Sequence, residues 1–369
     1  MRKFFDFKSM SKAKRAPILT ISGVILAYII MEILIAAGAV SSLMEGILVP
    51  VCVYSLAALG LNLCVGILGE LSLGHAGFMC IGAFFGVITS KLLKPVISND
   101  ILLFICALVV GVIAAAIFGF LIGIPVLRLR GDYLAIVTLA FGEIIKGIVN
   151  VLYIYRDANG LHVAFGDKNN MVVDEATKEV ILDGPLGLPQ IPQLATFTIG
   201  VVLIVLALLL IYHFVNSRTG RAVMAIRDNR IAAESVGLNI TGYKLLAFSV
   251  SAAIAGAAGV LYAHNLSTVT ATSSNFGYNQ SIMILVYVVL GGIGSIPGSI
   301  IAATILTILP EALRGFSTYR MLIYSVVLIA VMLFTWSPKA RDFKERMKLK
   351  FTVMFKKVFK KKEVLNDAK

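Results

Sequence analysis

The chain contains a series of long apolar runs, several of them about 20 residues long, separated by polar breaks. A helix of that length crosses the hydrocarbon core of a bilayer, which is roughly 30 Å thick. A soluble domain of 369 residues could not cover so much apolar surface when 59% of its residues are hydrophobic and only 14% are charged. The sequence therefore predicts an all-α, polytopic membrane protein with a multi-pass location in the cell membrane.

Two glycine-rich segments interrupt the apolar sequence, Gly69–Gly77 and Gly291–Gly298. The second break divides the run 281–309 either into two short crossings, which gives ten membrane helices, or into a re-entrant pair, which gives eight. The first run is longer than the core of a signal peptide, so it is expected to remain as a membrane helix. The predicted apolar runs are 18–40, 47–68, 78–92, 101–126, 134–153, 197–215, 245–266, 281–309 and 321–336.

The net charge of +13 is concentrated at the two ends of the chain. Residues 1–15 hold six Lys/Arg against one acid, and residues 338–369 hold twelve against four. Basic segments beside membrane helices stay on the cytoplasmic side, so both tails are predicted to be cytoplasmic and to flank a membrane domain of residues 16–337. Anionic membrane lipids are the expected partners of such tails, and nucleic acid is not.

Two polar stretches between the runs differ in charge. Residues 216–244, here called the platform, contain four arginines and Lys244, whereas residues 154–193 contain six acids and three bases. Six runs precede the platform, so it is expected on the cytoplasmic side together with the N-terminus, and 154–193 is expected outside.

Several functional classes have no support in the sequence. The chain lacks G-x-x-x-x-G-K-[ST], so it is not expected to bind ATP through a P-loop, and it lacks H-E-x-x-H and G-x-S-x-G. The four cysteines lie inside apolar runs without C-x-x-C spacing and are expected to be core residues. We therefore expect no catalytic residues, no metal site and no cofactor bound by this chain, which indicates that it is not an enzyme.

The platform has the composition of a docking surface. Ala232 and Ala233 would let a partner helix approach closely, Gly237 permits a turn after a helix, and the arginines could meet acidic groups of a soluble partner. Composition alone is equally consistent with an ordinary solvated amphipathic loop.

Residues 216–248, NSRTGRAVMAIRDNRIAAESVGLNITGYKLLAF, resemble the cytoplasmic coupling loop, or EAA loop, of permease subunits in ABC importers, in particular branched-chain amino-acid permeases of the M type. Three further segments resemble the same family: SLGHAGF at 72–78, DYLAIVTLAFGEI at 132–144 and LGGIGSIPGS at 290–299. Together the segments extend the resemblance over most of 47–336. The acidic loop matches only in part, through Asn159-Gly160 and the segment 184–192.

The resemblance implies a permease that imports leucine, isoleucine or valine. It also implies a homologous second permease subunit, two cytoplasmic ATPase subunits that use ATP, and an extracytoplasmic amino-acid-binding protein. In the family the platform docks onto the ATPase, and the family's acidic residue falls at Ile231 here. The residues expected to couple to the ATPase are Arg227, Asp228, Asn229, Ala232, Ala233, Glu234 and Gly237.

A substrate path is expected at the glycine breaks, because unwound backbone at membrane depth can present amide and carbonyl groups to a zwitterion. Close helix packing by small residues is the alternative. Glu143 and Lys146 share a helix face and would form a structural ion pair or take part in transport. The candidate path residues are Asn62, Ser72, Gly74, His75, Gly77, Glu143, Gly291, Gly292 and Gly294.

Two other transporter functions remain open from the sequence. Permeases for urea and short amides share these motifs. An ion-coupled secondary transporter would work without an ATPase and would use Glu143, Lys146 or His75 as its coupling group.

Overall fold

A computed structural model of the protein describes residues 12–129, 131–157, 160–166 and 179–336. The chain divides into two compact units, Met1–Ile308 and Leu309–Lys369. The two basic tails predicted at 1–15 and 338–369 lie outside the described residues, apart from 12–15.

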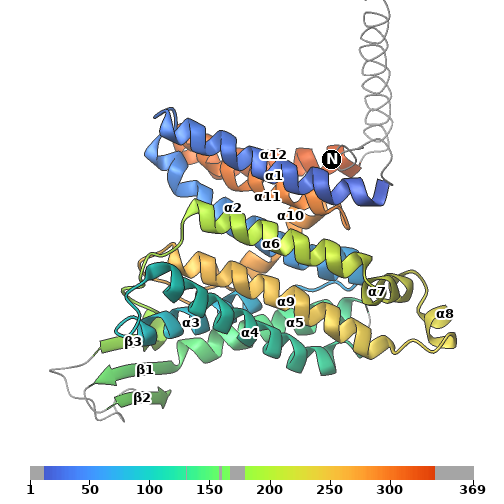
Figure 1. Ribbon diagram of the computed structural model, residues 1–369, viewed down its shortest axis with the longest axis horizontal. Coiled ribbons are helices and arrows are strands. Elements are labelled where there is room, and N and C mark those ends of the chain that lie inside the picture. Colours follow the sequence, from blue (N-terminus) through green and yellow to red (C-terminus); the bar gives the residue numbers. More distant parts are fainter. Residues whose placement is uncertain (1–11, 130, 158–159, 167–178, 337–369) are drawn as a thin grey trace, which may run out of the picture. The chain divides into compact units, whose positions relative to one another are not determined.

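Helices make up most of the described chain (Figure 1). Six of them are long and apolar enough to cross a membrane, and α10 and α11 are shorter apolar helices. The prediction of a largely helical chain with the properties of a polytopic membrane protein is therefore confirmed. The apolar helices are α1 (Lys12–Ala36), α2 (Ser42–Asn62), α3 (His75–Leu93), α4 (Asp100–Val126), α5 (Asp132–Asn150), α6 (Phe197–Asn216), α9 (Ile240–His264), α10 (Tyr278–Gly291), α11 (Ile296–Ala312) and α12 (Arg320–Trp336).

Helix α2 continues directly into a π-helix, η1 (Leu63–Leu68). A π-helix closes i to i+5 hydrogen bonds and is rare, but it occurs frequently at functional sites. Gly69 follows with a φ of +80°, in the left-handed region that favours glycine. The first glycine break therefore begins with a change of helix type that the sequence did not predict.

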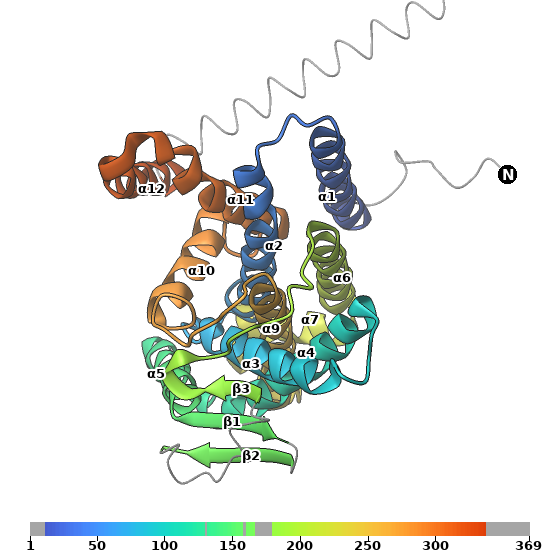
Figure 2. The ribbon, with the colours of Figure 1, turned by 90° about the vertical axis from the view of Figure 1, so that its left-hand side faces the viewer.

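Helix α9 is the centre of the first unit and packs against α2, α3 and α4 (Figure 2). Its small residues allow this close packing: a methyl group on Gly256 would overlap the Ala115 side chain of α4, and one on Gly259 would overlap the Met79 backbone of α3. Small residues have this role generally between membrane helices, where backbones must approach for van der Waals contact to hold the helices together.

The acidic loop contains a three-stranded antiparallel sheet in the order β2-β1-β3. The strands are β1 (Leu152–Asp157), β2 (Gly160–Phe165) and β3 (Glu179–Asp183), and a short 3-10 helix, η3 (Gly184–Leu186), follows. The all-α prediction is therefore wrong for this part of the chain. Strand β1 pairs with a strand on each side, and its adjacent residues Ile154 and Tyr155 are both buried, on opposite faces of the sheet, where the register with β3 shifts.

Two short helices form the platform, α7 (Arg218–Asp228) and α8 (Arg230–Ser235). Ser217 and Asn229 cap them, with side-chain oxygens that accept from the backbone N–H groups of Gly220 and Ala232. Ile226, Ala233 and Ile240 form a small apolar core beneath them. The predicted helical platform is thus two helices that break at Asn229 and connect α6 to α9.

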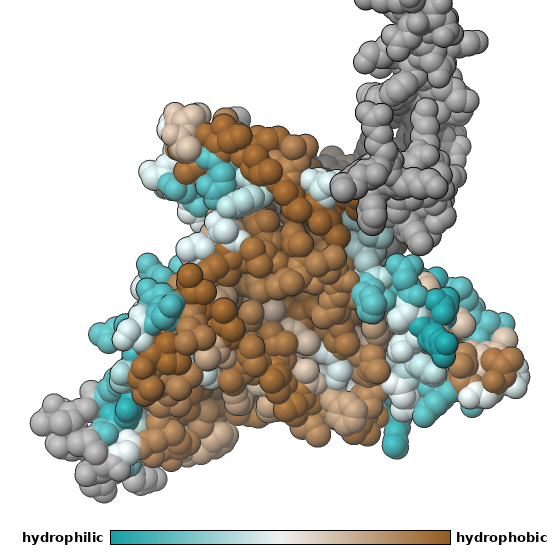
Figure 3. All heavy atoms as spheres, in the orientation of Figure 1, coloured by the Kyte–Doolittle hydropathy of each residue, from teal (hydrophilic) through white to brown (hydrophobic). Residues whose placement is uncertain are grey.

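The surface of the first unit changes in polarity along the helix direction. Figure 3 shows a broad hydrophobic surface over α4, α6 and α9, hydrophilic surface at the platform, and mixed surface near the sheet, where β2 exposes Leu161, Val163 and Phe165. Helices α4 and α6 are exposed along much of their length, and no residue in the apolar window of α1 is buried. Apolar helix surface that is exposed over this length is what a bilayer requires.

The second unit includes the end of α11, the 3-10 helix η4 (Arg314–Tyr319) and α12. Arg314 donates to Glu311 at 2.8 Å on the surface of this unit.

Candidate functional site

The inner face of the platform is fixed by one arginine. Nη1 of Arg227, in the last turn of α7, donates to the Gly66 carbonyl at 2.8 Å, and its Nε and Nη2 donate to Asp228. Gly66 lies in η1, and the neighbouring Gly69 lies against the Arg227 side chain, with no room for a methyl group. The platform is therefore attached to the π-helix at the end of α2 by a hydrogen bond and by close packing.

On its other side Gly66 contacts the second glycine break. A methyl group on Gly66 would overlap both Asn62 and the backbone of Gly294. Asn62 is buried; its Oδ1 accepts from the Gly294 N–H at 2.8 Å, and its Nδ2 donates to the Ser299 hydroxyl at 2.9 Å. The predicted path residues Asn62 and Gly294 are thus joined directly, and the second glycine break contacts η1, which immediately precedes the first break.

A second link runs from the start of α9. Lys244 forms an ion pair with Glu70, and the two side chains are only 10% and 14% exposed. Arg227, Arg230, Lys244 and Glu70 border a pocket of about 240 Å³ at this junction. The charged groups here are largely paired within the chain, so the junction is held by electrostatic contacts as well as by packing.

The outer face of the platform presents apolar side chains instead. Ile231 is 81% exposed and Val236 is 75% exposed, and Figure 3 shows a small hydrophobic patch at the α8 tip within hydrophilic surface. Gly237 ends α8 with a φ of +83°, and its N–H donates to the Glu234 carbonyl. Among the remaining coupling candidates Ala232, Asp228 and Asn229 are exposed, whereas Ala233 is buried in the platform core.

His75 begins α3 and is completely surrounded. Its Nε2 lies 2.7 Å from the Ser251 hydroxyl and its Nδ1 lies 3.2 Å from the Ser72 hydroxyl. The adjacent Gly74 and Gly77 let α3 approach the backbone of α5 at Thr138 and Gly142. The contacts of this group are therefore contacts between packed helices, made by Ser72, Gly74, His75 and Gly77. Gly291 and Gly298 likewise approach each other closely, between α10 and α11.

Glu143 lies apart from the junction, on a polar face of α5. It forms an ion pair with Lys146, as expected from their spacing, and its Oε1 also accepts from the Tyr278 N–H at the start of α10. Lys146 donates to the Ser273 hydroxyl at 2.8 Å, and Asn150 donates to the Ala271 carbonyl at 3.1 Å. Three polar residues at positions i, i+3 and i+7 of α5 therefore hold the segment 271–278.

The opposite side of that segment is also anchored. Leu188 and Val269 exchange backbone hydrogen bonds, and Phe276 packs edge-on against Phe84 and Tyr262. This segment lies between the predicted apolar runs 245–266 and 281–309, and no site was predicted in it. Its proximity to α5 could have been suspected from the polar residues Glu143, Lys146 and Asn150 on one helix face.

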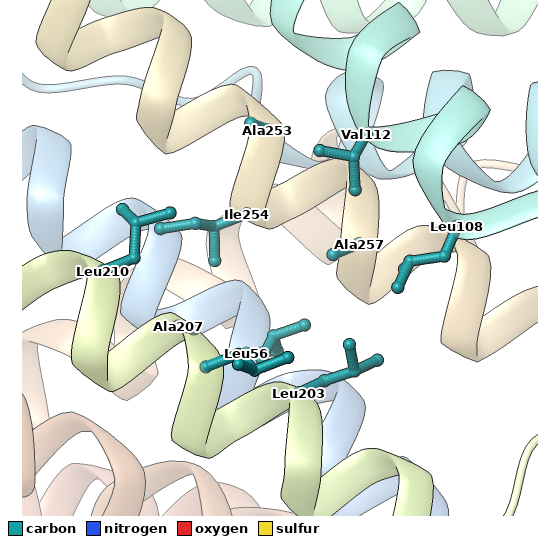
Figure 4. Close-up of a pocket in the computed structure, with 10 residues that line it drawn as sticks. Leu56, Leu108, Val112, Leu203, Ala207, Leu210, Ala253, Ile254 and Ala257 are labelled. Atoms are coloured by element: carbon teal, nitrogen blue, oxygen red, sulfur yellow. The ribbon is translucent and has the colours of Figure 1, made fainter. Parts of the chain in front are cut away.

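An apolar pocket of about 160 Å³ lies between α2, α4, α6 and α9 (Figure 4). Leu56, Val112, Leu203 and Ile254 are among its lining residues, and their side chains contribute only carbon atoms. A zwitterion could not replace its hydration there, so this pocket is not a substrate site. Within the described residues, no group of three His, Cys, Asp or Glu side chains could hold a metal ion.

Residues 43–335 match the family model described as "Branched-chain amino acid transport system / permease component". Among curated proteins, the chain is 37% identical over 295 residues to the "High-affinity branched-chain amino acid transport system permease protein LivM" of Salmonella typhimurium, covering 78% of this chain and 67% of the relative. The LivM protein of Escherichia coli K12 is also 37% identical, over 296 residues and the same shares of the two chains.

A second set of relatives is more distant. The chain is 27% identical over 295 residues to the "High-affinity branched-chain amino acid transport system permease protein LivH" of Escherichia coli K12, covering 76% of this chain and 88% of the relative. No solved structure matches the chain.

Proposed function

Since this chain belongs to the family of permease components of branched-chain amino acid transport systems, we propose that its platform couples the membrane helices to a separate ATPase. The chain is a transport protein and not an enzyme, and it is the permease component of a high-affinity ABC system. Leucine, isoleucine and valine are the proposed substrates. The proposed energy source for their import is ATP, hydrolysed by two cytoplasmic subunits.

The observation that carries this proposal is the two-sided platform. Its outer side exposes Ile231 and Val236, which lie five residues apart on α8 and its C-terminal end, where a partner surface could bury both. Its inner side holds the π-helix through Arg227. A protein that docks on α8 would therefore have a direct mechanical connection to the membrane helices.

The proposed route of coupling follows the hydrogen bonds. A shift of α7 would move Arg227 and, through its hydrogen bond, the Gly66 carbonyl. Gly66 also contacts Asn62, whose side chain forms hydrogen bonds to Gly294 and Ser299; these two bonds are here called the Asn62 clamp. The hydrogen bonds of a π-helix span five residues instead of four, and such segments occur frequently at functional sites, so η1 is the proposed point of movement. Movement at the platform would thereby alter the packing of α2 against the α10–α11 break.

The proposed topology places ten apolar helices in the membrane, with the platform and both tails in the cytoplasm and the three-stranded sheet outside. This follows from the basic charge of the platform and tails under the positive-inside rule. The separate helices α10 and α11 support two short crossings. Similarity to both LivM and LivH proteins supports a heteromeric assembly with a second permease subunit, and an extracytoplasmic binding protein is proposed as the source of substrate.

An ion-coupled transporter is less consistent with the site. Both ring nitrogens of His75 lie beside hydroxyl groups, and Glu143 is paired with Lys146, so neither group is placed as a free proton carrier. A permease for urea or short amides would retain the same coupling route, and the ligand of the binding protein distinguishes it.

Substitution at Gly237 tests the coupling proposal. A methyl group at Gly237 meets nothing within 4 Å, but the φ of +83° disfavours any β-branched residue, so Gly237→Val should reorient α8 without disturbing the membrane helices. The expected result is loss of ATPase co-purification and of ATP-dependent leucine uptake. Gly237→Asn tolerates the same φ and is the matched control. Normal assembly and uptake in Gly237→Val would refute the docking role.

A further inference from the structure

The chain between α9 and α10 is not helical, although part of it lies beside the membrane helix α5. Asn150, Lys146 and Glu143 of α5 contact residues 271, 273 and 278 in turn. Residues 143 and 150 are about 10 Å apart along a helix axis. The segment 271–278 therefore follows α5 for about 10 Å before α10 begins, which also explains why α10 has only 14 residues.

Non-helical backbone at membrane depth is tolerated only where protein covers it or where it lines a water-filled space. One side of this segment is covered, since Phe276 and Gly277 are buried. The other side is polar and open: Thr272 and Ser274 are exposed, and their hydroxyls lie 3.0 Å apart. Hydroxyl groups facing lipid would be costly, so the open side is suited to water.

The ion pair beside this segment is also partly open. The Glu143 side chain is 31% exposed and the Lys146 side chain is 16% exposed. Each Glu143 oxygen accepts one hydrogen bond, from Tyr278 at Oε1 and from Lys146 at Oε2, and each oxygen can accept another. A partly exposed carboxylate and ammonium group match the charges of an α-amino acid with opposite sign, and the Ser273 hydroxyl on the ammonium group is followed and preceded in the sequence by Ser274 and Thr272.

We propose that Glu143, Lys146 and the open side of residues 271–278 form a transit site for the charged end of a zwitterionic amino acid. Glu143 accepts from the ligand ammonium group, and Lys146 together with the Thr272 and Ser274 hydroxyls donates to its carboxylate. The identity of the ligand rests on the proposed function. Because the pair is already neutralised when the site is empty, the ligand exchanges one ion pair for two and leaves no charge unpaired.

Accessibility of Ser274 provides the test. In the purified transporter with its partner subunits, Ser274→Cys should react with a membrane-impermeant maleimide in at least one of two states, nucleotide-free or held with a non-hydrolysable ATP analogue. Ile113→Cys is the matched control, because it is 53% exposed on the apolar surface of α4 and should not react. Cys106 is only partly buried, so both variants carry Cys106→Ser.

Protection of Ser274→Cys from labelling by different ligands shows which ligand groups the site recognises. Leucine should slow the labelling of Ser274→Cys, by about threefold when its concentration is twice its dissociation constant. 4-Methylpentanoate, which is leucine without the amino group, should not protect, and Glu143→Gln should abolish protection by leucine. Glutamine still accepts from the Tyr278 N–H, so the start of α10 is preserved.

Three outcomes would overturn the site. These are no labelling in either state, equal protection by leucine and 4-methylpentanoate, or full protection by leucine in Glu143→Gln. Co-purification of the ATPase subunits is measured on the same preparation, so failure of the site in an assembled transporter is distinguishable from failure of the coupling proposal.

Discussion

The Arg227 guanidinium and the Gly66 carbonyl are 161 residues apart in the sequence and form a hydrogen bond of 2.8 Å. The bond joins the platform to the π-helix at the end of α2. A carbonyl at the end of a π-helix has no partner in its own helix and requires an external donor. Arg227 therefore satisfies the backbone of η1 and links it to α7 by the same contact.

Replacement of Arg227 by leucine should uncouple the platform from η1. The loss of a charged hydrogen bond costs roughly 1.5 to 3 kcal/mol, equivalent to about a ten- to hundredfold change in an equilibrium constant. We expect ATPase subunits to co-purify normally with Arg227→Leu, while leucine uptake per ATP hydrolysed falls by about tenfold or more. Reconstituted vesicles in which both quantities are measured provide the test.

Arg221→Leu is the matched control for this experiment. Arg221 is exposed on the same helix and donates to the Asn216 carbonyl at the end of α6, without contact to η1. Its removal should leave the ratio of uptake to hydrolysis unchanged. Equal losses in the two variants would show that the Gly66 contact has no special role.

Asn62→Leu should destabilise the protein because it removes both hydrogen bonds of the clamp. The buried Ser299 hydroxyl would lose this partner at a cost of about 1 to 3 kcal/mol, and the Gly294 N–H would lose its hydrogen bond in a partly buried place. The melting temperature of the purified protein in detergent should fall. Ser55→Ala is the control on the same helix, since the buried Ser55 hydroxyl has no hydrogen-bond partner in the described part of the chain. A larger loss in Ser55→Ala than in Asn62→Leu would contradict the importance of the clamp.

The membrane helices could be predicted from the sequence because each apolar run has the length that a bilayer requires. The run 101–126 and the helix Asp100–Val126 differ by one residue at one end. The ion pair of Glu143 and Lys146 followed from a spacing of three residues in a helix. These features are local, so the order of residues is sufficient to specify them.

The junction at Gly66 could not be predicted because its contacts are long-range. No local pattern distinguishes the π-helix Leu63–Leu68 from an α-helix, and nothing in the sequence relates Arg227 to Gly66 or Asn62 to Gly294. The sheet was missed for a related reason, since β1 is stable only with partners on both sides. Tertiary contacts decide the structure in both places.

Glu70 and Lys244 should show strong energetic coupling. Removal of one member of a largely buried pair leaves an uncompensated charge, which costs about 3 to 5 kcal/mol, so Lys244→Met alone should lower the melting temperature markedly. The double variant Glu70→Gln, Lys244→Met leaves no charge and should recover most of that stability. A double-mutant cycle on thermal unfolding measures the coupling, and additive effects of the two substitutions would rule it out.

Ile231→Ser combined with Val236→Ser should weaken ATPase docking without loss of stability. Both side chains are exposed in the permease, so the substitutions remove no internal packing. If a partner buries them, each contributes about 1.5 to 3 kcal/mol to association, and the affinity for the ATPase subunits should fall by at least roughly tenfold. Pull-down with purified ATPase subunits measures this affinity. Leu186→Ser is the control, because Leu186 is 69% exposed next to the sheet and belongs to the opposite polar end of the unit. Since the serine variants keep the Arg227 contact with Gly66, an unchanged affinity would place the docking surface elsewhere on the chain and leave the inner link intact.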